Sequence, residues 1–266
     1  MTNPTAPTRN PGRRRPPPRP VEVVSVDRVT PRLVSITVTG DALHGFELTQ
    51  PTSHIKLFLA PDGGELVLPT QGPDGPVFPD DAMRPVIRTY TPRRYDATTN
   101  TLEIQFALHG EGPAAQWAGR AAAGDKLAVA GPGGRFQLDT AAERWWIAGD
   151  ESALPAIAGL LESLPITARA EVHLEVADAT DELPLPAASV TWHHRRAGAY
   201  GAELLAAATA LTVSPGTSYW VACEAAAVRR IRRQLLDAGV PRQSLTTRGY
   251  WRLGEANHPD HDYGED

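Results

Sequence analysis

The sequence predicts two domains, a β-barrel followed by an α/β domain with an open parallel sheet. From residue 21 to about residue 138, short runs of alternating apolar and polar residues are broken by Gly and Pro, which is typical of antiparallel strands. From Arg144 onward, strand-like and helix-like runs alternate, which is typical of a parallel sheet. A chain of 266 residues can bury one large or two modest cores.

The expected elements follow these two rhythms in order. The barrel should contain strands at residues 21–26, 33–38, 55–59, 101–108 and 126–130, a β-rich segment at 88–94, a long loop at 61–83 and a tight turn at 131–134. The second domain should contain strands at 145–148, 169–177, 189–193, 219–223 and 244–248, with helices at 152–164, 202–211 and 228–238. The last helix should bury Val228, Ile231 and Leu235 and expose its four arginines, Arg229, Arg230, Arg232 and Arg233.

Both ends of the chain differ in composition from its body. Residues 1–19 are rich in Pro and Arg and contain no acid, so they predict a disordered arm. They lack the apolar stretch of a secretory signal. Residues 255–266 are acidic and predict a second disordered tail. No run reaches the roughly 18 apolar residues of a membrane span.

Arg88-Thr89-Tyr90-Thr91 is the most informative motif. Because side chains alternate along a strand, Arg88 and Tyr90 should share one face and Thr89 and Thr91 the other. A guanidinium can take a phosphate bidentately, and Tyr90 can lie against a flat ring. Backbone amides near Thr91 can bond the edge of a heterocycle. The motif therefore suits a flat cofactor that carries phosphate, although a half-buried strand with no ligand also explains it.

A helix start about twenty residues later offers a second phosphate site. After the strand at 101–108 come His109, Gly110, Gly112, Pro113 and Ala114. Gly112 and Pro113 are typical of a helix start, where free backbone amides and the helix dipole attract anions. The alternative is an ordinary helix start after a turn.

The turn from Gly149 to Ala153 opens the second domain. In an open parallel sheet, ligands bind beyond the carboxyl ends of the strands, which is where Asp150, Ser152 and Ala153 are expected. The sequence has no Gly-x-Gly-x-x-Gly motif, so this turn takes the place of the usual dinucleotide loop. Asp150 and Ser152 are also explained as a helix cap without any ligand.

These runs resemble the siderophore-interacting proteins, which are FAD-dependent ferric-siderophore reductases. The resemblance extends from about residue 21 to residue 254, and rests on HIKL at 54–57, RTYTPR at 88–93, the run from His109 to Trp117, GDESALPA at 149–156 and GYWR at 249–252. It implies a Greek-key flavin-binding barrel at residues 20–140 and an open parallel-sheet domain that binds NADH or NADPH at residues 141–254. Two positions depart from the family pattern, because Ser152 replaces a usual Thr and Cys223 a usual Gly.

The resemblance also implies where each ligand binds. FAD is expected at Arg88, Thr89, Tyr90, Thr91, His109, Gly112, Pro113 and Ala114, and the cofactor site is expected to include Asp150, Ser152 and Ala153. Lys56 and Arg252 are expected beside the open flavin face, where they attract an anionic ferric siderophore. The electron transfer requires no catalytic acid or base, and no metal-ligand spacing is found among the eight histidines.

Charge and cysteine content exclude other classes of protein. A net charge of −5 argues against a nucleic-acid-binding body. Cys223 is the only cysteine, so the chain can form neither an internal disulfide nor a cysteine-ligated iron–sulfur cluster, which fits the cytoplasm. Cys223 is interpreted as a small buried residue, with an approach to the nicotinamide as the alternative. The segment from His193 to Arg196 fits a solvated loop or a contact to the nucleotide ribose or its phosphate.

The sequence therefore predicts a monomeric flavoprotein reductase whose partner is a ferric siderophore. Neither nucleic acid nor stable membrane insertion is expected. A ferredoxin or flavodoxin as electron partner is one alternative, and a non-catalytic module that binds a flavin or a siderophore is another.

Overall fold

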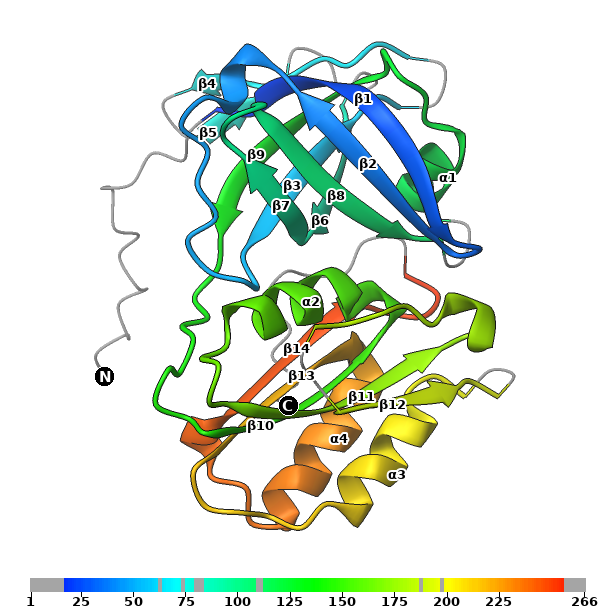
Figure 1. Cartoon of the computed structure of the whole chain (residues 1–266). Coiled ribbons are helices and arrows are strands. Elements are labelled where there is room, and N and C mark those ends of the chain that lie inside the picture. Colours follow the sequence, from blue (N-terminus) through cyan, green and yellow to red (C-terminus); the bar gives the residue numbers. More distant parts are fainter. Residues whose placement is uncertain are drawn as a thin grey trace, which may run out of the picture.

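The computed structural model describes residues 17–61, 64–72, 75–78, 84–108, 112–186, 189–196 and 199–255. Figure 1 shows two lobes, with the first half of the chain curled into a barrel and the second half forming an open sheet below it. This arrangement confirms the predicted fold class. None of the described helices is long and apolar enough to cross a membrane.

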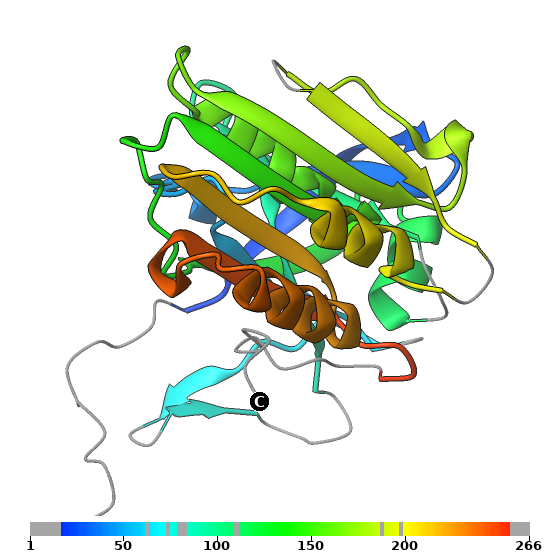
Figure 2. The same ribbon diagram turned by 90° about the horizontal axis from the view of Figure 1, so that it is seen from below.

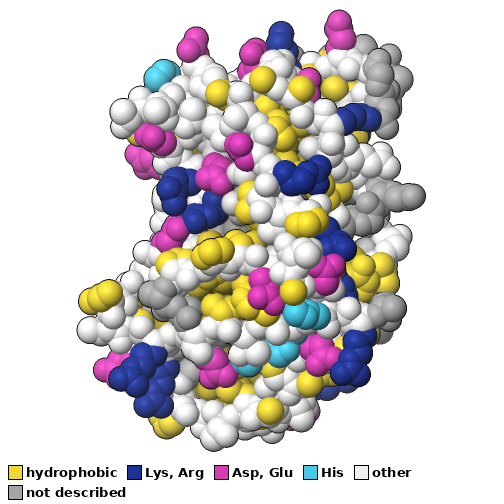
Figure 3. Space-filling model, turned by 45° about the vertical axis from the view of Figure 1, so that its right-hand side comes forward, with side chains coloured by type: hydrophobic (Ala, Val, Ile, Leu, Met, Phe, Trp, Pro, Cys, Tyr) yellow, Lys and Arg dark blue, Asp and Glu magenta, His cyan; other side chains and the backbone are white. Residues whose placement is uncertain are grey.

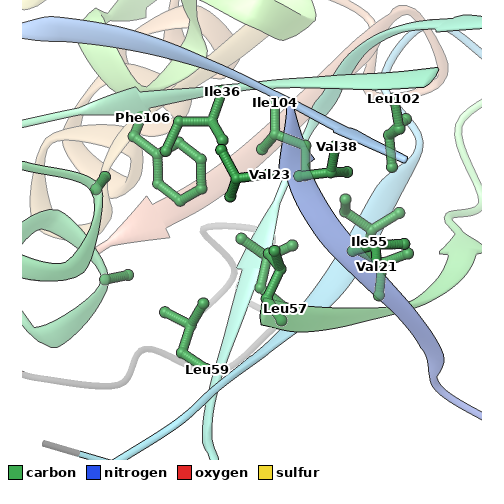
Figure 4. Close-up of a cluster of buried hydrophobic side chains, with 14 of the residues drawn as sticks. Val21, Val23, Ile36, Val38, Ile55, Leu57, Leu59, Leu102, Ile104 and Phe106 are labelled. Carbon is green, nitrogen blue, oxygen red and sulfur yellow. The ribbon is translucent and has the colours of Figure 1, made fainter. Parts of the chain in front are cut away.

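Among the described residues, seven antiparallel strands form the barrel, with the spatial order β6-β3-β9-β1-β2-β8-β7. The strands are β1 (Arg19–Thr30), β2 (Leu33–Thr39), β3 (His54–Leu59), β6 (Val86–Tyr90), β7 (Pro92–Asp96), β8 (Thr101–Ala107) and β9 (Lys126–Gly133). Alternate side chains point inward and form one apolar core, in which Ile36, Ile55, Leu57 and Phe106 are fully buried. Figure 4 shows these side chains, from β2, β3 and β8, pointing toward one another together with Val21 and Val23 of β1. The helix α1 (Pro113–Arg120) packs against this core through Ala114 and Trp117.

The second lobe is a parallel sheet with the strand order β12-β11-β10-β13-β14. Its strands are β10 (Arg144–Asp150), β11 (Arg169–Val176), β12 (Ser189–His194), β13 (Thr217–Glu224) and β14 (Leu245–Trp251). Trp145 and Ile147 face α2 (Leu154–Ser163), which lies between the sheet and the barrel (Figure 1). Trp146 and Ala148 face the opposite layer, α3 (Ala202–Ala210) and α4 (Ala225–Asp237). Figure 2 shows these two helices side by side on that face.

Several expectations need correction. The tight turn expected at 131–134 is wrong, because β9 continues to Gly133 and pairs it with His54 across a bulge. Arg19, assigned to the disordered arm, begins β1 and pairs with Val129. Within the described part of the 61–83 loop lies a short hairpin, β4 (Thr70–Gly72) and β5 (Gly75–Val77). Arg232 is only 8% exposed, so α4 does not expose all four of its arginines. Residues 1–16 and 256–266 lie outside the described residues.

Candidate flavin and nucleotide site

Tyr90 lies at the end of β6, where the barrel core meets α1. The pairing of β3 with β6 sets Ile55 opposite Tyr90 and Leu57 opposite Arg88, so these four residues share the inner face. The Tyr90 ring lies 4.5 Å from the ring of Phe106, which in turn lies 5.6 Å from that of Trp117. Burial raises the pKa of the Tyr90 hydroxyl, so it stays a neutral phenol. The aromatic series thus holds β6, β8 and α1 together.

Arg88 is a half-buried cation without a countercharge among the described residues. Its Nη1 donates to the backbone oxygen of Ile87 at 2.8 Å, and no carboxylate of the described chain pairs with it. Burial lowers the pKa of its guanidinium. Because an unpaired buried charge is costly, a phosphate at this position would satisfy both its charge and its remaining donors. Arg88 therefore fits a cofactor that carries phosphate.

The start of α1 offers a second set of donors for a phosphate. Gly112 is the N-cap and Pro113 occupies the first turn, and within the described part of the chain no side chain caps the first amides. A Cβ added at Gly112 would meet no atom within 4 Å, so space is open around this helix start. α1 contacts β6 and β8, so the helix lies beside the strand that carries Arg88. His109 and Gly110 lie outside the described residues.

The two threonines of the motif make different contacts. Lys56 Nζ donates to Thr89 Oγ1 at 3.0 Å, so Thr89 lies on the outer face of the barrel, away from Arg88 and Tyr90. Thr91 is buried beside Tyr250 of β14, where its side chain lowers the pKa of the Tyr250 phenol against the larger opposing effect of burial. The end of β6 is thereby joined to the last strand of the sheet. Sequence reasoning placed Thr91 near the cofactor but missed its partner Tyr250.

Asp150 joins three elements at the carboxyl edge of the sheet. Its Oδ1 accepts hydrogen bonds from the backbone and hydroxyl of Ser152, while its Oδ2 accepts from Glu224 N at 2.9 Å and Trp251 Nε1 at 2.8 Å. The short helix η3 (Glu151–Ala153) starts from this cap, and Ala153 is fully buried beneath it. Burial, followed by the charge of Glu151, raises the pKa of Asp150 to about 7.

Arg195 is neither solvated nor open to a ligand. It follows β12, and its side chain is only 10% exposed. It makes two hydrogen bonds to Glu151, at 2.6 and 3.0 Å, and its Nη1 lies 3.7 Å from Glu175. The guanidinium also lies 4.3 Å from the centre of the Tyr200 ring. Arg195 therefore neutralises the acids beside the Asp150 turn, which corrects both interpretations of the segment from His193 to Arg196 for this residue.

The end of β14 carries the second expected docking residue. Trp251 is held by Asp150 and packs edge-on against Tyr200, with ring centres 4.9 Å apart. Arg252 follows it, 37% exposed, with Nη1 at 3.1 Å from Glu255 Oε1. Lys56 and Arg252 thus belong to different domains, and each already contacts a neighbour. Cys223, one strand away, is 1% exposed and burial raises its thiol pKa, which agrees with its interpretation as a buried residue.

A cavity of about 220 Å³ opens between the two domains. Barrel-side residues Thr52 and Arg135 line it together with Trp220, Arg248 and Tyr250 from the sheet. Near it, Arg248 Nη2 lies 3.5 Å from His54 Nδ1, so β14 and β3 face each other directly. The sequence motifs identified the two strands, but no local pattern indicated that Arg248 and His54 meet across 194 residues.

Comparisons with known proteins agree with this geometry. The family model for the siderophore-interacting FAD-binding domain matches residues 22–136, and the model for siderophore-interacting proteins matches residues 142–254. The ferric vibriobactin reductase ViuB of Vibrio cholerae is 35% identical over 92% of this chain and 93% of its own length. The NADPH-dependent ferric-chelate reductase of Escherichia coli is 37% identical over 55% of this chain and 57% of its own. The crystal structure of a siderophore utilization protein from T. fusca superposes with a TM-score of 0.83, at 37% identity, over 93% of this chain and 98% of that one.

Proposed function

The chain belongs to the siderophore-interacting protein family, and we propose that it is a flavin-dependent reductase that passes electrons from NADH or NADPH to ferric siderophores. The observation that carries the proposal is Arg88, a half-buried cation on the inner face of the barrel without a carboxylate partner in the described chain. Bound FAD supplies the step that the side chains cannot, because a nicotinamide gives two electrons together and ferric iron accepts one.

The protein's own share is to bind and to orient. We propose that Arg88 and the first amides of α1 hold the diphosphate, with Tyr90 against the flavin ring and Thr91 at its edge. The turn from Asp150 to Ala153 receives the nicotinamide at the carboxyl edge of the sheet. Lys56 and Arg252 attract the anionic chelate from the two sides of the domain junction. Reduced iron binds hard oxygen chelators less tightly, so it is released.

The same proposal extends to the cellular setting. We propose that the protein works in the cytoplasm as a monomer, since one chain carries both binding domains and its single cysteine is buried. Size-exclusion chromatography with light scattering would test the monomer.

Anaerobic stopped-flow spectroscopy tests the reaction directly. The yellow, FAD-loaded protein should bleach on mixing with NADH or NADPH and regain its colour on mixing with a ferric chelate, while an Fe(II) indicator reports the released metal. Recovery of colour with oxidised ferredoxin but not with ferric chelates would assign a protein partner. If neither NADH nor NADPH bleaches the flavin, the protein would be a non-catalytic module that binds a flavin or a siderophore. A colourless protein that takes up no FAD would reject the proposal as a whole.

A further inference from the structure

Arg93 closes the RTYTPR run and lies at the junction of the two domains. It belongs to β7, and its Nη1 and Nη2 donate to Glu162 Oε2 and Oε1 of α2 at 2.9 and 2.5 Å. The side chain of Arg93 is only 13% exposed, so the pair is partly shielded from water. The hydrogen bonds that Arg93 donates to Glu162 raise the pKa of Arg93, and the same contact lowers the pKa of Glu162. Arg93 thus connects the barrel to the sheet domain through a bidentate ion pair.

Asp181 makes a second connection between the same domains. It ends the short helix η4 (Ala179–Asp181) after β11 and is 4% exposed. Its Oδ1 accepts from Thr30 Oγ1 at 2.8 Å and from Arg32 N at 3.1 Å, and its Oδ2 lies 2.6 Å from Arg32 Nη1. All three donors come from the end of β1 and the turn that follows it. Figure 3 shows acidic and basic side chains next to one another near the junction of the two lobes.

Packing between these connections is close. Leu33, the first residue of β2, is buried in the apolar cluster of the second domain. A Cβ added at Gly159 of α2 would come within 3.2 Å of the backbone oxygen of Pro51. Rigid-body movement of one domain against the other would therefore break two charged contacts and disturb a tightly packed surface. These contacts fix the position of the carboxyl edge of the sheet relative to the end of β6.

We propose that Arg93 and Asp181 are positioning residues that set the distance between the nicotinamide and the flavin. A hydride passes from the reduced nicotinamide to the flavin only when the reacting atoms approach to about 3–3.5 Å, and a displacement of about 1 Å costs on the order of 100-fold in rate. The proposed nicotinamide site, the turn from Asp150 to Ala153, belongs to the sheet domain, and the proposed flavin site around Arg88 belongs to the barrel. The contacts at the domain junction therefore set the distance between the two sites. The inference rests on the proposed reductase function.

The test measures flavin reduction in the FAD-loaded protein with Arg93→Gln and Asp181→Asn. We expect the limiting rate of reduction at saturating nicotinamide to fall about 10–100-fold, with the Kd of the nicotinamide and the FAD content unchanged. Arg94→Gln is the matched control, because Arg94 is 63% exposed and reaches the same Glu162 Oε1 only at 3.6 Å. The exchanged pair Arg93→Glu with Glu162→Arg should recover most of the lost rate.

The outcomes separate the proposal from simpler roles. Reduction at the wild-type rate in both folded variants would overturn it, and so would loss of FAD from Arg93→Gln, which would make Arg93 a flavin ligand. If Arg93→Gln does not fold, Arg93→Lys keeps the charge but not the bidentate geometry, and small-angle X-ray scattering should then show a changed domain separation. An unchanged scattering profile and rate in Arg93→Lys would contradict the proposal. Failure of the wild type itself to oxidise NADH or NADPH would instead reject the proposed function.

Discussion

At the scale of single residues, three arginines of this chain differ in what neutralises them. Arg93 and Arg195 each form a two-point contact with a carboxylate, to Glu162 and Glu151. Arg88 has no such partner in the described residues, although it is half-buried. A buried guanidinium that is already paired has few donors left for a ligand, whereas an unpaired one gains from binding an anion. The absence of a countercharge among the described residues, rather than the residue type, therefore favours Arg88 as the proposed phosphate ligand.

Arg88→Ala should weaken FAD binding by about 1.5–3 kcal/mol, the usual range for a hydrogen bond to a charged group. The loss is measured as the increase in the Kd of FAD, from flavin fluorescence during titration of the apoprotein. Arg93→Gln is the internal control, because it removes a charge five residues away in the same run without touching the inner face of β6. Equal weakening of FAD by both substitutions would argue that the loss reflects folding rather than phosphate binding.

Asp150 should give flavin reduction a pH dependence near neutrality. Four donors favour its ionised form, but burial and the charge of Glu151 outweigh them and raise its pKa to about 7. Loss of a hydride leaves positive charge on the nicotinamide, which an ionised carboxylate at the same sheet edge stabilises. The rate of flavin reduction should therefore rise as the pH increases through about 7. Asp150→Asn should be slower and lack this inflection, with FAD still bound.

The contribution of Asp150 to stability has the opposite sign. Because the folded pKa lies above the ordinary value of about 3.9, the folded state binds more protons between these two values. This contribution is complete below about pH 4 and is lost as the pH rises through about 7. Ser152→Ala is a useful comparison, since it removes a hydroxyl donor that favours the ionised form and should move the inflection to higher pH. An unchanged inflection in Ser152→Ala and in Asp150→Asn would assign it to another group.

At the scale of elements, periodicity predicted most of the fold. The expected strands at 33–38, 55–59 and 101–108 correspond to β2, β3 and β8, and the buried face of α4 contains Val228, Ile231 and Leu235 as expected. Local pattern failed where pairing with a distant strand decides the structure. The Gly-rich run from Gly131 to Gly133 is typical of a turn. In the structure it continues β9, because it pairs with β3. The β-rich segment expected at 88–94 divides into β6 and β7. Pro92, Arg93 and Arg94 carry no apolar alternation, and pairing with β8 makes them a separate strand.

The candidate site shows the same division. Motifs located β6, the start of α1 and the turn at Asp150, because each carries a distinctive local sequence. The contacts that join them are between residues far apart in the chain, such as Thr91 with Tyr250 and Asp150 with Trp251. No periodicity encodes such contacts, since they depend on how the two domains and their strand ends come together.

The turn at the end of β10 requires a glycine. A Cβ at Gly149 would lie 2.7 Å from Ile157 Cδ1, 2.9 Å from Ala153 Cβ and 3.0 Å from the backbone oxygen of Ala222. Gly149→Ala should therefore lower the free energy of unfolding by about 1–3 kcal/mol, as overpacked cores do. Gly119→Ala in α1 is the matched control, because its Cβ would meet nothing within 4 Å, and it should raise stability by about 0.5–1 kcal/mol. Urea unfolding of both variants measures the difference, and an unaffected Gly149→Ala would show that the turn can relax.

At the scale of the whole molecule, the chain divides its chemistry between two domains. The barrel carries the flavin motif, and the sheet presents the Asp150 turn at its carboxyl edge. The last strand, β14, approaches the barrel in its second half, with Tyr250 beside Thr91 and Arg248 near His54. A ligand between the domains therefore contacts both. If each half-reaction depends on different residues at this junction, a substitution should disturb one without the other.

Lys56 and Arg252 provide the test of that separation. Ferric catecholate complexes carry several negative charges, and cations on both sides of the junction should attract them with a salt-sensitive force. Lys56→Gln with Arg252→Gln should raise the KM for the chelate and flatten its dependence on ionic strength. Flavin reduction by NADH or NADPH should keep its rate, because Lys56 lies on the outer face with Thr89 and Arg252 lies beyond Trp251. Equal slowing of both half-reactions would indicate a folding defect instead.

Replacement of Glu255 should change the KM for the chelate in the opposite direction. It accepts from Arg252 Nη1 at 3.1 Å, so an incoming anion must compete with it for the guanidinium. Glu255→Gln should therefore lower the chelate KM, most strongly at low salt, where exposed charges are least screened. The effect should vanish when Arg252 is also replaced, since the two substitutions act through one contact. Steady-state assays with an anionic ferric chelate at low and high ionic strength measure all three variants. A KM that responds to Glu255→Gln even without Arg252 would mean that the chelate senses the acidic end of the chain as a whole, and not this pair.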